Sequence, residues 1–269
     1  MLKQRIITAL ILLPLILGAI FYLDTPWFAL AMAIPVALGA WDWANIMGIE
    51  DPVRRLPYVG IVLALLMLVY LTRFNAVLYL GCLWWLAAVW LVKSYPAEVA
   101  RWEGRGVQSL IGLLVLVPAW WSLVLIQGQA DGHWWLLYVM LLVWGADTGA
   151  YFVGRKLGKN KLAPAVSPGK SIEGLLGGLA TTAVIALLVA FSTHASDRAG
   201  LIPFLLISLV AVIGSVFGDL AESMFKRHRG IKDSSQLLPG HGGVLDRIDS
   251  ITAAVPLFAS GMLLLGAMQ

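Results

Sequence analysis

Residues 223–249 read SMFKRHRGIKDSSQLLPGHGGVLDRID, a polar, charged and glycine-rich stretch in a chain that is otherwise mostly apolar. Apolar runs long enough to cross a membrane lie on both sides of it. Asp219 and Glu222 end the run before it, and Asp246 and Asp249 open the run after it. The basic residues between them are Lys226, Arg227, Arg229 and Lys232. Carboxylates that can bind a metal and cations that can bind phosphate, gathered at a membrane surface, indicate phosphate chemistry on a lipid.

The composition of the chain is that of a membrane protein. Of its 269 residues, 60% are hydrophobic and 13% are charged, and the mean hydropathy is +0.85. Soluble globular domains carry about 25% charged residues and fewer apolar ones. The apolar excess is too large for a hydrophobic core and predicts an all-α, polytopic integral membrane protein. The single cysteine, Cys82, lies inside an apolar run and cannot form an intrachain disulfide.

A membrane-spanning helix needs about 20 mostly apolar residues, and about nine runs of the chain meet that requirement. They cover residues 5–23, 27–49, 57–72, 76–92, 107–127, 134–154, 172–193, 201–222 and 250–268. The third run is short and Asp42 interrupts the second, so eight or ten spans are also compatible with the sequence. Lys3 and Arg5 precede the first run as in a signal peptide, but no small-x-small cleavage site follows. We therefore expect an uncleaved first span.

Lysine and arginine fall almost entirely on one side of the expected membrane. With the N-terminus in the cytoplasm, 17 of the 19 Lys and Arg residues lie in inside segments, and only Arg73 and Arg198 lie outside. Cytoplasmic loops of membrane proteins carry an excess of Lys and Arg. The split therefore predicts a cytoplasmic N-terminus, an odd number of spans and a C-terminus on the periplasmic or outer side.

This topology gathers the acidic residues of the second half of the chain at the cytoplasmic face. Four span ends contribute them: Asp147, Glu173, Asp219, Glu222, Asp246 and Asp249. We expect residues 1–130 to form a scaffold of five spans and residues 131–269 to form the catalytic region. The cytoplasmic loops of that region are expected at 155–171 and 223–249.

The converging carboxylates favour a metal–phosphate site. Oxygen ligands are the ones that Mg²⁺ prefers, with waters and substrate phosphates completing its shell. Asp219 and Asp246 each lie near the inner end of an expected helix. The alternative is a structural ion cluster in which they pair with Arg227 or Arg247. A single aspartate would favour that alternative, whereas several carboxylates beside a basic loop favour the metal.

Lys170 lies in the segment SPGKS, residues 167–171, at the expected start of a helix. The N–H groups and dipole of a helix N-terminus favour a bound phosphate. The letters GKS resemble the end of a P-loop, but Pro164 stands where the earlier glycine is required. The other basic residues of this loop are also explained by orientation and attraction to anionic lipid.

Two further polar residues have open interpretations. His241 lies in GHGG, residues 240–243, where glycines allow close backbone approach to a ligand. It can donate to a phosphate or act as an acid or base, or it can be an ordinary loop histidine. Asp42 is a carboxylate at membrane depth, which is costly and is functional or buried against a partner. Its neighbours Trp41, Trp43 and Asn45 favour an interfacial or broken stretch.

The stretch 223–249 resembles the signature of phosphatidate cytidylyltransferases, also called CDP-diacylglycerol synthases. The positions that fit it without a gap are Ser223, Lys226, Arg227, Lys232, Asp233, Ser235, Leu238, Pro239, His241, Gly242, Gly243, Asp246, Arg247 and Asp249. ADTGAYFVGR at 146–155 and SPGKSIEG at 167–174 resemble upstream motifs of the same family. Relatives commonly carry KKTxEG in the latter, so Gly169, Ser171 and Ile172 are mild variants. The resemblance covers residues 140–250, and the first 130 residues match it only as generic spans.

The resemblance implies that CTP and phosphatidic acid react to give CDP-diacylglycerol and pyrophosphate, with Mg²⁺ as the cofactor and a monovalent cation such as K⁺ as an optional second one. The implied metal ligands are Asp219, Asp246, Asp249 and Asp147. The implied catalytic residues are Asp219, Asp246, Lys226, Arg227, Lys232 and His241. The implied substrate-binding residues are Ser167, Lys170, Glu173, Ser223, Asp233, Gly242, Gly243 and Arg247. The lipid phosphate is already ionised near neutral pH, so His241 need not be a general base.

The expected partners are CTP, phosphatidic acid and the lipid bilayer, with no nucleic acid, and glycine-rich helix faces permit a homodimer. The expected location is a bacterial inner membrane, with the active site on the cytoplasmic face. One alternative is a CTP-dependent lipid or polyprenol kinase, which would release CDP instead of pyrophosphate. Another is an ion-coupled transporter, since intramembrane carboxylates also mark ion pathways. Transporter sites lie near the midplane between repeats, and this sequence has no visible repeat.

Overall fold

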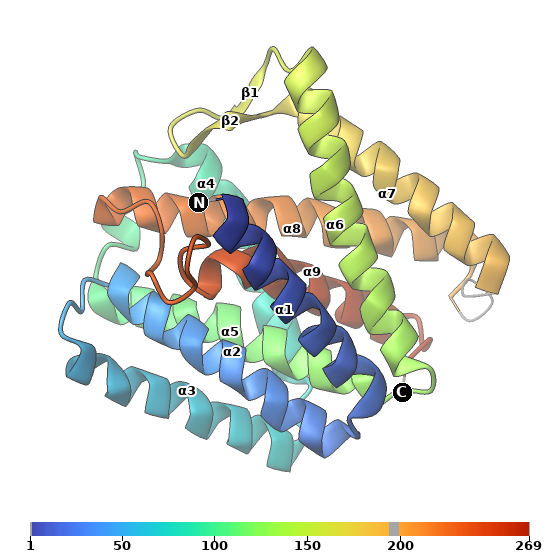
Figure 1. Cartoon of the computed structure of the whole chain (residues 1–269), viewed down its shortest axis with the longest axis horizontal. Helices are drawn as coiled ribbons and strands as arrows, with labels where there is room; N and C mark the ends of the chain where they lie inside the picture. The colour runs from blue at the N-terminus through green and yellow to red at the C-terminus, as the bar shows by residue number, and fades with distance from the viewer. Residues whose placement is uncertain (1, 194–198, 269) are drawn as a thin grey trace.

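The structure, a computed structural model, describes residues 2–193 and 199–268. Its described residues form nine α-helices, one short 3-10 helix and one β-hairpin (Figure 1). The helices are α1 (Leu2–Tyr22), α2 (Thr25–Ile46), α3 (Pro52–Thr72), α4 (Ala76–Ser94), η1 (Val99–Arg101), α5 (Arg105–Gln127), α6 (Gly132–Leu157), α7 (Ile172–Thr193), α8 (Leu201–Arg229) and α9 (Leu245–Leu264). The strands are β1 (Lys161–Ala163) and β2 (Ser167–Ser171), which pair antiparallel.

The prediction of an all-α, polytopic membrane protein is confirmed. In the described part of the chain, the eight helices from α2 to α9 are long and apolar enough to cross a membrane. α1 adds a shorter apolar segment, Leu10–Tyr22. Large apolar side chains such as Leu68 on α3 and Phe191 on α7 point outward, 54% and 72% exposed. A helix that is apolar all round and still exposes such residues is one that faces lipid.

The helices form a central bundle with a steeply crossing pair on one side. α8 and α9 pack along each other, and α5, α4 and α2 surround them. α6 packs chiefly against α7, and the two helices lean across the bundle beside α8 (Figure 1). Small residues allow α6 and α7 to approach closely: a Cβ on Gly149 would lie 2.2 Å from Thr181 Oγ1, and one on Gly177 2.5 Å from Val153.

Two helices extend further into the polar stretch than the sequence indicated. α8 continues to Arg229 and ends at Gly230, whose φ of 74° is the left-handed conformation typical of a C-terminal glycine. α9 begins at Leu245. The loop expected over 223–249 is therefore confined to residues 230–244, which we call the signature loop. Lys226 and Arg227 lie on α8, and both Asp246 and Asp249 lie on the first turns of α9.

The segment that contains Lys170 also differs from the expectation. α7 begins at Ile172, as expected, but residues 167–171 before it, expected as a loop that leads into the start of the helix, form strand β2. β2 pairs with β1, with Lys161 opposite Ser171 and Ala163 opposite Ser167. The hairpin stands beside the end of α6 and the start of α7 (Figure 1). Lys170 is thus presented by a strand rather than by a helix terminus.

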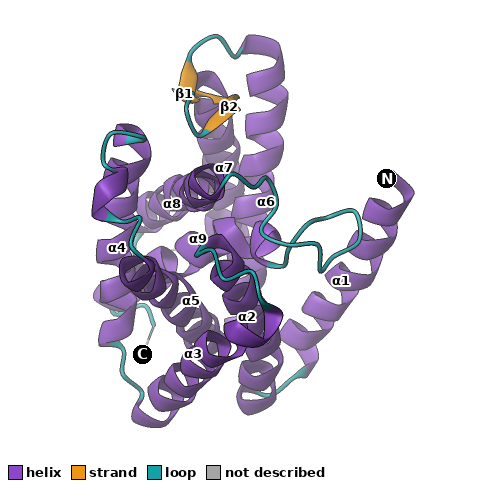
Figure 2. Ribbon diagram, turned by 90° about the vertical axis from the view of Figure 1, so that its left-hand side faces the viewer, coloured by secondary structure: helices purple, strands orange, loops and turns teal. Residues whose placement is uncertain are grey.

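Of the two alternatives for the stretch around Asp42, interfacial or broken, the structure excludes the break, because α2 runs unbroken through this residue. The Asp42 side chain is 0% exposed. Figure 2 looks onto the end of the bundle that carries the signature loop, with the hairpin above it. The signature loop crosses this end from α8 to α9 and touches α1, since Thr8 Oγ1 donates to the Pro239 carbonyl at 3.4 Å.

Candidate active site

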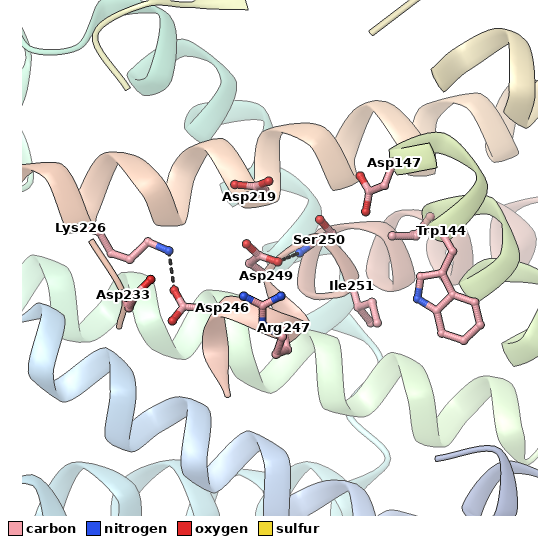
Figure 3. Close-up of a pocket in the computed structure, with 11 residues that line it drawn as sticks. Trp144, Asp147, Asp219, Lys226, Asp233, Asp246, Arg247, Asp249, Ser250 and Ile251 are labelled. Carbon is pink, nitrogen blue, oxygen red and sulfur yellow. Dashed lines mark hydrogen bonds and ion pairs between the residues drawn. The ribbon is translucent and has the colours of Figure 1, made fainter. Parts of the chain in front are cut away.

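A cavity of about 490 Å³ opens between α6, α8, α9 and the signature loop (Figure 3). Its lining residues are Val143, Trp144, Asp147, Asp219, Lys226, Asp233, Asp246, Arg247, Asp249, Ser250 and Ile251. The structure thus brings together all four residues that the sequence nominated as metal ligands. It adds Lys226, Asp233 and Arg247, three of the nominated catalytic or substrate-binding residues.

The charge of this lining is strongly acidic. Five carboxylates face the cavity, against the two cations Lys226 and Arg247. An anionic ligand alone would be repelled by such a lining, because like charges within one cavity interact strongly where water is scarce. The cavity is therefore suited to a ligand that arrives with cations, or to an anion whose charge a bound cation neutralises.

Asp246 is held by four donors. Its Oδ2 accepts from the Gly243 N–H at 2.7 Å, the Ser234 N–H at 2.9 Å and the Ser234 hydroxyl at 2.9 Å. Its Oδ1 lies 2.5 Å from Lys226 Nζ (Figure 3). Lys226 Nζ also lies 3.2 Å from Glu222 Oε1, one turn earlier on α8. Asp246 therefore ties the signature loop to α8 as well as lining the cavity.

Asp219 has fewer and more accessible partners. Its Oδ2 forms an ion pair with Lys170 Nζ at 2.8 Å, and its Oδ1 accepts from the Ser223 hydroxyl at 3.2 Å. The Lys170 and Asp219 side chains are 28% and 35% exposed, against 10% and 5% for Lys226 and Asp246. Strand β2 thereby delivers Lys170 to the rim of the cavity. The Lys170–Asp219 pair can exchange partners with a ligand more readily than the Lys226–Asp246 pair.

Asp147 connects this cavity to a second one of about 350 Å³. The second cavity lies between α6, the hairpin, α7 and α8, and Lys170, Tyr151 and Arg155 are among its lining residues. The Lys170–Asp219 ion pair therefore stands where the two cavities meet. A ligand in either cavity can reach it.

The carboxylate oxygens of the cavity suit a hard divalent cation that keeps part of its hydration shell. In the described part of the chain, no three His, Cys, Asp or Glu side chains lie close enough to enclose an ion by themselves. Mg²⁺ is commonly bound by one or two carboxylates together with waters and substrate phosphates. Asp219 and Asp249 face each other across the cavity and would make such a pair (Figure 3).

Gly242 and Gly243 have a structural reason to be glycine. Gly242 has a φ of 85°, which residues other than glycine rarely adopt. A Cβ there would lie 2.6 Å from Asp246 Oδ2. Gly243 donates its N–H to Asp246, and a Cβ there would lie 2.0 Å from Ser234 Oγ. The two glycines allow the loop backbone to approach the carboxylate.

Several nominated residues lie apart from the cavity lining described above. Arg227 Nε donates to the Val166 carbonyl at 3.3 Å, which ties α8 to the hairpin turn. Lys232 is exposed on the signature loop. His241 lies in a tight turn, where its backbone N–H donates to the Leu238 carbonyl at 2.9 Å. Its ring nitrogen Nδ1 is buried without a hydrogen bond in the described structure. Their nominated catalytic roles stay predictions.

The other two outlying residues shape the hairpin. Ser167 is the first residue of β2. Glu173 accepts from the Lys159 N–H at 3.1 Å, the Asn160 N–H at 3.2 Å and the Asn160 side-chain amide at 2.7 Å. Its carboxylate therefore closes the turn between α6 and β1 onto the start of α7. Substrate contact by either residue stays a prediction.

The sequence analysis missed Ser234, as it missed the lining residues Val143, Trp144, Ser250 and Ile251. Ser234 is 0% exposed and gives Asp246 two of its four donors. In sequence it is one serine of KDSS in a polar loop, where exposure is the usual expectation. Its burial depends on side chains of α2, which lie about 190 residues away in the chain. The sequence held no local signal for that contact.

Comparison with known proteins gives one family and close relatives. The model of the cytidylyltransferase family matches residues 3–265 of this chain. The phosphatidate cytidylyltransferase of Pseudomonas aeruginosa is 52% identical over 262 residues, covering 97% of this chain and 96% of that protein. The phosphatidate cytidylyltransferase of Haemophilus influenzae is 42% identical over 282 residues, covering 96% of this chain and 98% of that protein. The one of Staphylococcus haemolyticus is 46% identical over 129 residues, about half of each chain.

Proposed function

Since this chain belongs to the cytidylyltransferase family, we propose that it transfers the cytidylyl group of CTP to phosphatidic acid, in phospholipid biosynthesis. The products are CDP-diacylglycerol and pyrophosphate. The observation that carries the proposal is the convergence of the signature carboxylates and Lys226 on one cavity of a membrane protein. Relatives that cover nearly the whole chain bear the name of this activity.

The reaction joins two anions. A phosphate oxygen of the lipid attacks the α-phosphorus of CTP and forms the new P–O bond. The bond from the α-phosphorus to the α,β-bridging oxygen breaks, and pyrophosphate leaves with that electron pair. The attacking phosphate is already ionised near neutral pH, so no residue has to remove a proton from it. Catalysis is therefore a matter of positioning and of charge stabilisation.

The acidic lining supports a requirement for Mg²⁺, because five carboxylates would otherwise repel both substrates. Asp219 and Asp249 would hold the ion, with the substrate phosphates completing its shell. A bound Mg²⁺ would supply positive charge that offsets the charge of the substrate phosphates and of the departing pyrophosphate. Lys226 and Arg247 supply fixed positive charge inside the cavity, and Lys170 supplies it at the rim. An incoming phosphate would compete with Asp219 for the Lys170 ammonium.

The rim of the cavity suits a lipid substrate. Val143, Trp144 and Ile251 form an apolar part of the lining next to the carboxylates. Phosphatidic acid would place its phosphate among the charged residues and leave its acyl chains along this apolar side. The basic residues around the signature loop support a cytoplasmic location of the site. A homodimer is a further prediction, which light scattering of the detergent-solubilised protein would test.

The test uses purified protein in detergent with CTP, phosphatidic acid and Mg²⁺, and follows pyrophosphate and CDP separately. Release of pyrophosphate that requires the lipid is the expected result. Loss of that release in EDTA, with recovery on adding Mg²⁺, would support the metal requirement. Release of CDP would assign the chain to the lipid kinases instead. Absence of both products from folded protein would overturn the proposal.

A further inference from the structure

A carboxylate from α2 caps the start of α9. Asp42 Oδ2 accepts from the Leu245 N–H at 3.0 Å, and the Asp42 side chain is 0% exposed. The first N–H groups of a helix have no partner within the helix and need an acceptor. Val244 occupies the position before α9, and its apolar side chain cannot supply one. Asp42 therefore fixes the start of the helix that carries Asp246.

A second polar side chain of α2 holds the signature loop. Asn45 lies three residues after Asp42, on the same side of the helix. Its side-chain N–H donates to the Ser234 carbonyl at 2.8 Å, and its Oδ1 accepts from Arg55 at 2.8 Å. Arg55 also donates to the Ile49 carbonyl at 2.7 Å. Arg55 thus fixes which way the Asn45 amide points, and Asn45 fixes the backbone of Ser234.

No free space separates the signature loop from the Asp42 side chain. Ser234 Oγ lies 3.4 Å from Asp42 Oδ2 and 2.9 Å from Asp246 Oδ2. A Cβ on Gly243 would lie 2.0 Å from Ser234 Oγ and 2.4 Å from Asp42 Oδ2. A shift of Asp42 would therefore move Ser234 and Gly243, which supply three of the four donors to Asp246. Asp246 in turn fixes Lys226 in the cavity.

Stability alone does not account for a carboxylate at this place. Asp42 Oδ1 is buried and accepts no hydrogen bond of good geometry from the described residues, although Ser235 and the Val244 N–H lie near the carboxylate. Burying a carboxylate with one oxygen unpartnered costs free energy that a smaller neutral acceptor would avoid. Asp42 and Asn45 do not occur among the described residues that line the 490 Å³ cavity, so any effect on the reaction passes through Ser234 and Asp246.

We infer that Asp42 and Asn45 are positioning residues for the cytidylyl-transfer site, which act by holding Ser234 and the start of α9 so that Asp246 and Lys226 keep their places in the cavity. This inference rests on the proposed function. It assigns a role in the site to the N-terminal half of the chain, through the residues of α2 that face the signature loop.

The test compares two replacements of Asp42 by steady-state kinetics. Asp42→Asn keeps an oxygen acceptor for the Leu245 N–H, whereas Asp42→Leu removes it and keeps the number and branching of the side-chain heavy atoms. We expect Asp42→Leu to lower kcat by about 100-fold, the loss typical of a displaced catalytic group. The KM values for CTP and phosphatidic acid should stay close to wild type. Asp42→Asn should recover most of kcat.

The matched control is Ser208→Ala. It removes a buried hydrogen bond between Tyr138 and Ser208, at 2.6 Å, which joins α6 to α8 away from the signature loop. We expect this variant to lose stability and to keep kcat near wild type. Hydrogen exchange gives a readout besides activity: peptides that cover 233–246 should exchange faster in Asp42→Leu and not in Ser208→Ala.

The outcomes separate the inference from the proposed function. Wild-type protein that makes no CDP-diacylglycerol defeats the proposed function, while the exchange comparison still tests the contact. The inference is overturned if Asp42→Leu keeps its kcat, or if Asp42→Asn is as inactive as Asp42→Leu. If Asp42→Leu does not fold, Asn45→Ala decides: a kcat loss with faster exchange confined to 233–246 supports the inference, and wild-type kcat overturns it.

Discussion

The carboxylates of Asp219 and Asp246 line the same cavity but have partners of different kinds. Asp246 accepts from two backbone N–H groups of the signature loop, from Ser234 Oγ and from Lys226. Asp219 accepts from two side chains, Ser223 and Lys170, and is more exposed. A group whose partners are side chains at a cavity rim can exchange them for a metal or a phosphate. Asp246 is committed to the shape of the loop, so Asp219 is the more available ligand.

Replacement of each aspartate by asparagine should separate these roles. We expect Asp219→Asn to lower kcat by at least about 100-fold, as for loss of a preorganised charge contact, and to leave hydrogen exchange of the signature loop unchanged. Asp246→Asn should lower kcat and also speed exchange over 233–245, because one accepting oxygen becomes an amide nitrogen, so that either the loop donors or Lys226 lose their acceptor. Wild-type-like turnover in Asp219→Asn would remove this residue from the metal site.

The two lysine ion pairs of the site should contribute unequally to stability. Lys226 pairs with Glu222 and Asp246 where the side chains are 10%, 4% and 5% exposed. Breaking a buried pair leaves uncompensated charge, so Lys226→Met should cost about 3–5 kcal/mol in the free energy of unfolding. Lys170→Met removes a partly exposed pair and should cost below about 1 kcal/mol. Thermal unfolding of the two variants in detergent compares them directly, and equal losses would contradict the ranking.

At the scale of elements, the hairpin is the device that presents Lys170. Glu173 holds the turn before β1 through three donors from Lys159 and Asn160. We expect Glu173→Ala to loosen the hairpin and to raise the KM for CTP by about 10-fold, with a smaller change in kcat. Glu173→Gln keeps an acceptor, so its KM for CTP should lie between those of the wild type and of Glu173→Ala. An unchanged KM in Glu173→Ala would show that Lys170 does not depend on this turn.

Element positions were largely predictable from the sequence, and element ends were not. Apolar runs of sufficient length predicted each of the described α-helices but not the 3-10 helix η1, because the lipid phase requires each backbone group to be satisfied within a helix. The run after Glu222 was treated as loop because it is polar. Nothing in MFKRHR opposes a helix, however, and α8 stops only at Gly230. The hairpin was missed because SPGKS has no strand alternation, and its pairing with β1 depends on the ends of α6 and α7.

At the scale of the whole molecule, topology brought most of the site together correctly. Of the six acidic residues expected to converge, four line the cavity: Asp147, Asp219, Asp246 and Asp249. The other two do not line it: Glu173 closes the hairpin turn, and Glu222 pairs with Lys226. The topology gave no information on the α2 contacts of Asp42 and Asn45, since these depend on how helices pack side by side rather than on which face they reach. The division into a scaffold of residues 1–130 and a catalytic region remains a prediction, and the contact of Asn45 with Ser234 argues for cooperation between the two parts.

The orientation of the molecule in the membrane is the remaining prediction at this scale. The distribution of Lys and Arg predicts that the signature loop lies in the cytoplasm and the α3–α4 turn outside. Because Cys82 is the single cysteine, a Cys82→Ser background allows one introduced thiol to report each side. Gln236→Cys on the signature loop should react with a membrane-impermeant maleimide only in inverted vesicles, and Phe74→Cys only in intact spheroplasts. Labelling of both positions from the same side would refute the alternation of spans. Reversed labelling would move the acidic cavity away from cytoplasmic CTP, and the proposed reaction would then lack its nucleotide.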